Sequence, residues 1–189
     1  MPVVLSERHE ELADQLVELF LAEGFRGLTL GDLTQRLRCS KTTLYALGES
    51  KEQLVGNAVV RFFRAATGEV EAATAAADGA EAKIAAYLSA VADALRPASA
   101  DFIADVAAHP TARRAYARNT KIAAGRVRDL VNEGVASGDF REVHAAFVAD
   151  TIAATMQRIQ SGDVLRTTGL HDAEAYEELA RLVLRGIRS

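Results

Sequence analysis

Apolar residues recur at helical spacing along most of the chain. Leu12, Leu16 and Phe20 form a stripe with the 3.6-residue period of an amphipathic helix, which ends at Gly24. Long stretches without proline, rich in Ala, Leu, Glu and Arg, favour helix over the rest of the chain. They predict further helices from Lys51 to a break at Asp78, and at about 80–95, 99–108, 111–136, 142–160 and 172–188. The pattern therefore predicts an all-α protein.

Two short segments with helix-capping residues follow the first helix. Thr29, with Asp32 three residues later, predicts a helix start and a helix over about 30–37. Ser40 predicts the start of another short helix over KTTLYAL, and Ser50 with Gln53 predicts the start of a third helix. Two short helices separated by a turn of about three residues form a helix-turn-helix pattern.

The composition is that of an ordinary globular protein, with 189 residues, 49% of them hydrophobic and 25% charged. The single cysteine, Cys39, excludes an internal disulfide and a cysteine-based zinc cage. No segment has the length and apolar character of a membrane span or a secretory signal. We therefore expect a cytoplasmic protein without membrane contact.

The net charge of −4 is unevenly distributed along the chain. Between Arg26 and Arg64 there are seven basic residues against three acidic ones, a local charge of +4, so the remainder carries −8. Salt screens the distant negative charge beyond about 10 Å, and a basic patch can still attract phosphate.

No motif of a nucleotide-binding loop or of a nucleophile elbow occurs in the chain. The four histidines, at positions 9, 109, 144 and 171, have no partner at metal-binding spacing. The sequence therefore predicts neither an enzyme nor a cofactor or metal site.

The segment from Glu10 to Leu54 resembles the N-terminal DNA-binding domain of the TetR family of transcriptional regulators. The strings ELADQLVELFLAEGF, LTLGDLTQRL, CSKTTLY and SKEQL carry the resemblance, and EGVASGDFRE is similar to the connection before the last two helices of that family. The resemblance implies a helix-turn-helix DNA-binding domain over residues 1–50 and a C-terminal helical effector-binding and dimerisation domain over residues 51–189. It also implies a sequence-specific repressor that a small apolar or aromatic ligand releases from a palindromic operator.

The resemblance also implies which residues contact DNA. A recognition helix needs short side chains at its first turn so that its backbone can approach the major groove. Helix N-termini attract phosphate, which adds Thr29 to the set. The expected DNA contacts are Thr29, Lys41, Thr42, Thr43, Tyr45 and Lys51. For Tyr45 a half-buried packing role is the alternative.

The chain departs from the family pattern around the recognition helix. Gly48 stands where an aromatic residue is usual, Leu47 where a polar side chain or histidine is common, and Ala46 where polar or basic residues are frequent. Arg38 occupies a turn position often held by glycine, at a cost of roughly 1 kcal/mol if the backbone there is left-handed.

We expect a homodimer, because a helix-turn-helix protein that reads two half-sites needs a two-fold partner. The last two long helices are expected to pair with their copies as a four-helix bundle. The expected contacts are Phe147, Val148, Ile152, Met156, Leu179, Leu182, Val183 and Ile187. The alternative is that these apolar stripes form the core of a single chain.

Aromatic residues make up only 6% of the chain yet recur after the helix-turn-helix segment. They predict an effector pocket lined by Phe62, Phe63, Tyr87, Phe102, Tyr116 and Met156. Tyr87, Tyr116, Arg126 and Gln157 are candidate polar anchors. A closed aromatic core is an equally good interpretation of these residues, and an all-α small-molecule carrier or enzyme is the alternative function.

Overall fold

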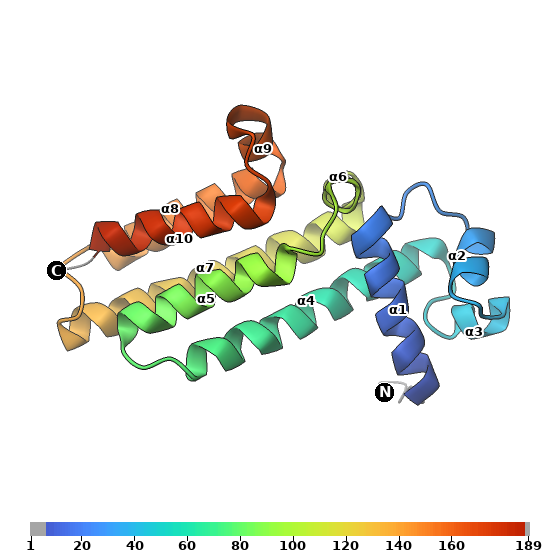
Figure 1. Ribbon diagram of the computed structural model, residues 1–189, viewed down its shortest axis with the longest axis horizontal. Coiled ribbons are helices and arrows are strands. Elements are labelled where there is room, and N and C mark those ends of the chain that lie inside the picture. The colour runs from blue at the N-terminus through green and yellow to red at the C-terminus, as the bar shows by residue number, and fades with distance from the viewer. Residues whose placement is uncertain (1–6, 188–189) are drawn as a thin grey trace. The chain divides into compact units, whose positions relative to one another are not determined.

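The computed structural model describes residues 7–187, and the segments of regular secondary structure in this range are all α-helices (Figure 1). The helices are α1 (Glu7–Glu23), α2 (Leu30–Arg36), α3 (Lys41–Tyr45), α4 (Lys51–Ala75), α5 (Ala80–Leu95), α6 (Ala100–Ala108), α7 (Pro110–Ser137), α8 (Ala145–Gln160), α9 (Asp163–Thr168) and α10 (Asp172–Ile187). The predicted all-α class is confirmed. The expected end of the last helix at residue 188 lies outside the described residues.

Helix α9 is the one described element that the sequence pattern did not predict. The segment Ser161 to Asp163 suggested only a break between two helices. In the structure the six-residue α9 begins after Gly162 and ends at Gly169, both in the left-handed conformation with φ of 73° and 78°. A helix this short has no apolar stripe that periodicity could reveal.

The chain packs as two compact units. Unit 1 comprises the residues up to Arg64 together with Ala98–Tyr116, and unit 2 comprises Ala65–Pro97 together with the residues from Ala117 onward. The packing boundary thus falls inside α4 rather than at the expected domain boundary after residue 50. Because compactness does not report binding, the division at residue 50 into DNA-binding and effector-binding parts stays a prediction.

Unit 1 is held together by an aromatic core. The Phe25 ring lies 5.5 Å from Phe20 and 6.2 Å from Phe102, measured between ring centroids. Phe20, Phe25 and Phe102 are all buried. The helix-turn-helix segment and α4 add Leu33, Leu44 and Leu54, which have no more than 1% of their surface exposed. Leu33 and Leu44 occupy the apolar positions of the short helices α2 and α3, and Leu54 occupies an apolar position in the first turn of α4.

Charged side chains fasten α1 to α4 at the surface of unit 1. The Arg61 guanidinium donates to both carboxylate oxygens of Asp14, at 2.7 and 2.9 Å, and also to Glu10. This hydrogen bonding holds the pKa of Asp14 below its usual value. Paired, two-bond contacts of this kind fix geometry, although exposed ion pairs add little to stability.

Unit 2 is built around α5, α8, α10 and the second half of α7. Helix α10 packs on α5 and α8, and Figure 1 shows α8 and α10 side by side. The core of unit 2 includes Ile84, Leu88, Leu130, Ile152 and Tyr176, each with at most 1% of its surface exposed. The alternation of these residues with polar ones at helical spacing explains why the helices form as the pattern predicted.

Candidate nucleic-acid interface

The two short helices begin at the expected caps. The Thr29 hydroxyl accepts a hydrogen bond from the Asp32 backbone N–H, and the Asp32 carboxylate accepts one from the Thr29 backbone N–H, which completes a capping box. The Ser40 hydroxyl accepts from the Thr43 backbone N–H at 3.1 Å. These contacts satisfy backbone donors that the first helical turn leaves unpaired.

The cap of α4 differs in one detail from the expectation. Ser50 accepts a hydrogen bond from the Gln53 backbone N–H at 3.2 Å, as predicted. The Gln53 side chain, however, accepts from the backbone N–H of Glu49 at 2.8 Å rather than from that of Ser50. The second hydrogen bond of this capping box therefore goes to the backbone N–H of the residue before the N-cap Ser50.

The turn between α2 and α3 adopts the strained conformation that Arg38 suggested. Arg38 has a φ of 49°, the left-handed region that costs most residues roughly 1 kcal/mol. Cys39 beside it is half-buried, and burial raises the pKa of its thiol. A short turn that packs α3, with its buried Leu44, against α2, with its buried Leu33, requires this sharp change of direction.

Helix α3 exposes most of the side chains expected to contact DNA. Lys41 and Thr42 in its first turn are exposed, and Tyr45 has 41% of its surface in contact with solvent. Thr43 is half-buried, and its hydroxyl lies 2.8 Å from that of Ser40. Leu44 is buried with 1% of its surface exposed, so one face of α3 packs on the core and the other faces solvent.

Two further predicted contacts are already engaged within the chain. The Lys51 ammonium donates to the backbone oxygen of Arg26 at 2.9 Å and retains two further N–H groups. The Thr29 hydroxyl donates to Asp32 at 2.6 Å, and this bond is the main reason that the pKa of Asp32 is lowered. Thr29 would reach a phosphate through its hydroxyl only after turning away from this carboxylate.

The departures after α3 have a structural reason. A side chain on Gly48 would place its Cβ 2.8 Å from the backbone nitrogen of Leu54, so the chain comes too close to α4 for any larger residue. Leu47 is buried, and its backbone oxygen accepts a hydrogen bond from the Asn57 amide at 2.7 Å. Leu47 and Gly48 are therefore packed positions of the α3–α4 connection, and of the three departures Ala46 alone is exposed.

Four of the six residues predicted for an effector pocket contact one another in unit 1. Phe62 lies 5.1 Å from Phe63 and 6.0 Å from Phe102, and Phe63 lies 4.9 Å from Tyr116. All four are buried. Their rings pack in tilted and edge-on arrangements, as in a filled aromatic core.

Tyr87 and Met156, the other two predicted pocket residues, belong to unit 2 and are also buried. Burial, followed by the nearby Glu71 carboxylate, raises the pKa of Tyr87 strongly. Glu71 pairs with Arg126 at 3.2 Å. The predicted anchors Tyr87 and Arg126 are thus neighbours of one carboxylate, Glu71, which the sequence pattern did not single out.

The residues predicted for a dimer interface divide into two groups. Phe147 on α8 and Leu182 on α10 are 70% and 72% exposed, and Val148 and Val183 are half-buried. The other four, Ile152, Met156, Leu179 and Ile187, are buried within the chain itself. These four residues therefore belong to the core of the single chain, the alternative interpretation, and offer almost no exposed surface to a partner.

The described residues contain no helix long and apolar enough to cross a membrane. In the same part of the chain, no group of three or more His, Cys, Asp and Glu side chains is placed to hold a metal ion.

Neither a protein-family model nor a curated protein sequence matches this chain. Solved structures do match it over nearly its whole length. A TetR transcriptional regulator from Chloroflexus aurantiacus is 23% identical with a TM-score of 0.69, over 97% of this chain and 99% of that one. A regulator of the TetR/AcrR family from Thermobifida fusca is 20% identical with a TM-score of 0.67, over 97% of this chain and 100% of that one.

A third similar structure is that of a putative transcriptional regulator from Saccharomonospora viridis in complex with choline. It is 16% identical with a TM-score of 0.75. The match covers 98% of this chain and 100% of that one. At such identities a likeness establishes the fold. The chain therefore has the fold of the TetR-family transcriptional regulators.

Proposed function

We propose that the protein is a sequence-specific DNA-binding transcriptional regulator, a repressor that a small molecule releases from its operator. The observation that carries the proposal is the exposed first turn of the Ser40-capped helix α3. Lys41 and Thr42 lie there with a basic side chain and a short hydroxyl side chain open to solvent. Short side chains at this turn allow a recognition helix to enter the major groove.

Each exposed side chain has a distinct task in this proposal. Thr42 reads base edges, because its hydroxyl can donate or accept and its methyl group can meet a thymine methyl. Lys41, Lys51 and the Tyr45 hydroxyl hold the DNA backbone. The proposed DNA contacts also include Thr43, whose hydroxyl hydrogen-bonds to that of Ser40, and Thr29 at the start of α2.

A palindromic operator would require a homodimer, and exposed apolar residues on α8 and α10 support one. Arg141, just before α8, donates from its backbone N–H to the backbone oxygen of Ile187. Its side chain donates to the backbone oxygen of Gly186, and both acceptors lie at the end of α10. Phe147 and Leu182 therefore lie towards the same end of the helix pair. Large apolar side chains that are exposed on one pair of helices are candidates for burial in a two-fold interface.

The effector is proposed to be a small apolar or aromatic molecule. The buried aromatic residues Phe62, Phe63, Phe102 and Tyr116 of unit 1 support this, as do Tyr87 and Met156 of unit 2. A structure of the same fold holds choline, which supports a small-molecule ligand for this fold in general. Within unit 2, Tyr87 beside the Glu71–Arg126 pair is a candidate polar anchor for such a ligand.

Selection of tight-binding duplexes from random double-stranded DNA tests the DNA-binding proposal without knowledge of the operator. The proposal predicts enrichment of a palindrome whose half-sites are centred about one helical turn apart. Lys41→Glu should abolish the enrichment, while Glu49→Lys, at an exposed position between α3 and α4, should not. Recovery of unrelated sequences by the wild-type protein would favour an all-α carrier or enzyme instead.

A further inference from the structure

Unit 1 contains a cavity of about 310 Å³ beside the start of α4. Its apolar walls are Phe25, Val55, Ala108 and Pro110, which come from the loop after α1, from α4, from the end of α6 and from the start of α7. The volume lies at the lower end of the range for small-molecule sites. None of these wall residues belongs to the set proposed above for the effector.

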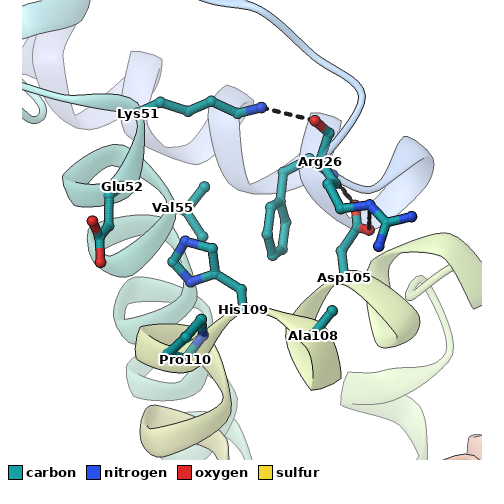
Figure 2. A pocket seen from close by; sticks show the side chains of 9 residues that line it. Arg26, Lys51, Glu52, Val55, Asp105, Ala108, His109 and Pro110 are labelled. Carbon is teal, nitrogen blue, oxygen red and sulfur yellow. Dashed lines mark hydrogen bonds and ion pairs between the residues drawn. The ribbon is translucent and has the colours of Figure 1, made fainter.

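The loop that forms one wall is held in place by Asp105 of α6. One Asp105 carboxylate oxygen accepts hydrogen bonds from the backbone N–H groups of Phe25 and Arg26, each at 2.7 Å. On the other side, Lys51 donates to the Arg26 backbone oxygen at 2.9 Å, and Figure 2 shows both contacts. Because α6 and α4 both hold this loop, the cavity is preformed, which reduces the ordering cost of binding.

The polar rim offers more free donors than free acceptors. One Asp105 oxygen accepts from two backbone N–H groups and the other lies 3.9 Å from the Arg26 guanidinium, while one Glu52 oxygen accepts from the Thr111 hydroxyl at 3.2 Å. Lys51 has two N–H groups beyond its bond to Arg26. A ligand that supplies acceptor oxygens therefore fits this rim better than a ligand that supplies donors.

His109 adds a donor that faces the apolar walls. Its Nδ1 accepts a hydrogen bond from the Ala112 backbone N–H at 3.4 Å, so in the neutral ring the proton resides on Nε2. The His109 ring packs edge-on to Phe25 at 5.7 Å and lies next to Val55 in Figure 2. Nε2–H is thus a donor beside an apolar surface, with Lys51 on the same rim.

We propose that this cavity binds a small carboxylate with a compact apolar or aromatic body. The body lies against Phe25, Val55, Ala108 and Pro110, and the carboxylate accepts from Lys51 and His109. Charge-assisted hydrogen bonds of this type are roughly twice as strong as neutral ones. The site is therefore expected to distinguish an anion from a neutral molecule of equal shape.

Occupation of the cavity would also affect DNA binding, a step that rests on the function proposed above. Lys51 is one of the proposed phosphate contacts, and a carboxylate bound to its ammonium group competes with the phosphate. By linkage, the carboxylate and DNA then weaken each other's binding by the same factor.

The test is a titration of the free protein with benzoate, followed by NMR of the Phe25 and Arg26 backbone amides. Benzamide and benzylamine serve as neutral and cationic probes of nearly equal shape. We expect saturable shifts with benzoate, about tenfold weaker binding of benzamide and no binding of benzylamine. Equal affinity for benzoate and benzamide, or no shift up to about 50 mM benzoate, would overturn the proposal.

Variants locate the site independently of the probe. Ala108→Phe fills the cavity from an exposed position and should abolish benzoate binding, whereas Ala104→Phe, also exposed on α6 but outside the cavity, should leave it unchanged. His109→Asn keeps an acceptor for the Ala112 N–H but removes the imidazole donor, and it should weaken benzoate more than benzamide. Wild-type benzoate affinity in Ala108→Phe would place the site elsewhere.

The titration contains no DNA, so its outcome does not depend on the DNA-binding proposal. With a selected operator duplex, benzoate should weaken DNA binding by the factor by which DNA weakens benzoate binding. Unchanged DNA affinity at saturating benzoate would contradict the competition through Lys51, although the binding site itself would stand.

Discussion

Thr42 and Lys41 are neighbours in the first turn of α3, yet their side chains should affect DNA binding in different ways. Thr42→Val keeps the shape of the side chain and removes its hydroxyl, so it should change the preferred base pair at one operator position. Lys41→Ala should instead weaken binding to all sequences and lower the slope of log affinity against log salt by about one unit. Anisotropy titrations with single-base operator variants at several salt concentrations measure both effects. An unchanged base preference in Thr42→Val would exclude its role as a base reader.

Asp172, the first residue of α10, links stability to pH. Its carboxylate has a buried oxygen without a hydrogen-bond partner among the described residues, and burial raises its pKa from 3.8 to about 6. The folded state therefore holds the proton more tightly than the unfolded state, and the free energy of unfolding falls as the pH rises from about 4 to about 6. Asp172→Asn should remove this decline and raise stability at pH 8 by about 1–2 kcal/mol, allowing for partial solvent contact.

Asp163 at the start of α9 provides a control of opposite sign for the urea titrations that measure this effect. A hydrogen bond from Arg166 lowers the pKa of Asp163, so its contribution is present at neutral pH and lost as the pH falls. Asp163→Asn should therefore not stabilise the protein at pH 8. If the free energy of unfolding of Asp172→Asn fell with rising pH as it does in the wild type, Asp172 would not be the group that links stability to pH.

Local contacts between residues were predictable from the sequence, and distant ones were not. The capping residues Thr29 and Ser40 form hydrogen bonds with residues three positions later, so the local order of residue types predicts these contacts. Asp105 bonds to Phe25 and Arg26, which are about 80 positions earlier. One acidic residue on a helix carries no signal of such a partner, so the sequence pattern missed the contact that shapes the cavity.

At the scale of the elements, two glycines of α7 should respond in opposite ways to the same substitution. A Cβ on Gly134 would lie 2.1 Å from the Phe140 ring and 2.8 Å from the Ala80 Cβ, whereas a Cβ on Gly125 meets nothing within 4 Å. Gly134→Ala should cost about 1–3 kcal/mol through overpacking, and Gly125→Ala should stabilise by about 0.5–1 kcal/mol. Urea unfolding measures both, and a stabilised Gly134→Ala would show that α7 does not approach Phe140 so closely.

The long helices were predictable because each has several turns of apolar residues at regular spacing, and most are followed within a few residues by glycine or proline. Helix α9 lacks both a long stripe and a buried residue, so no pattern revealed it. The close approach of Gly134 to Phe140 depends on how the segment after α7 folds back. Periodicity within one helix does not contain that information.

At the scale of the whole molecule, the proposed dimer depends on exposed apolar side chains of α8 and α10. Phe147→Glu combined with Leu182→Glu should raise the dimer dissociation constant by about a hundredfold, because large central apolar residues dominate interfaces. Ile122→Glu on α7, at a residue with 61% exposure, controls for the loss of an exposed apolar side chain outside the proposed interface. Sedimentation velocity distinguishes the species, and a wild-type protein that remains monomeric at micromolar concentration would refute the dimer.

The sequence could predict the fold class but not the packing of the two units. The segment Ala98–Tyr116 belongs to unit 1 although it follows α5 in the chain, because Phe102 and Asp105 contact the loop after α1. Its composition differs little from that of neighbouring helices. Assignment of α6 to unit 1 therefore required the three-dimensional contacts.

The most direct test of the proposed function is the ratio of affinities for a selected duplex and for a scrambled duplex of the same composition. The ratio should be measured at about 150 mM salt, where non-specific phosphate binding is weak. We predict at least about a thousandfold preference for the selected duplex. Equal affinity for the two duplexes would contradict sequence-specific regulation by this protein.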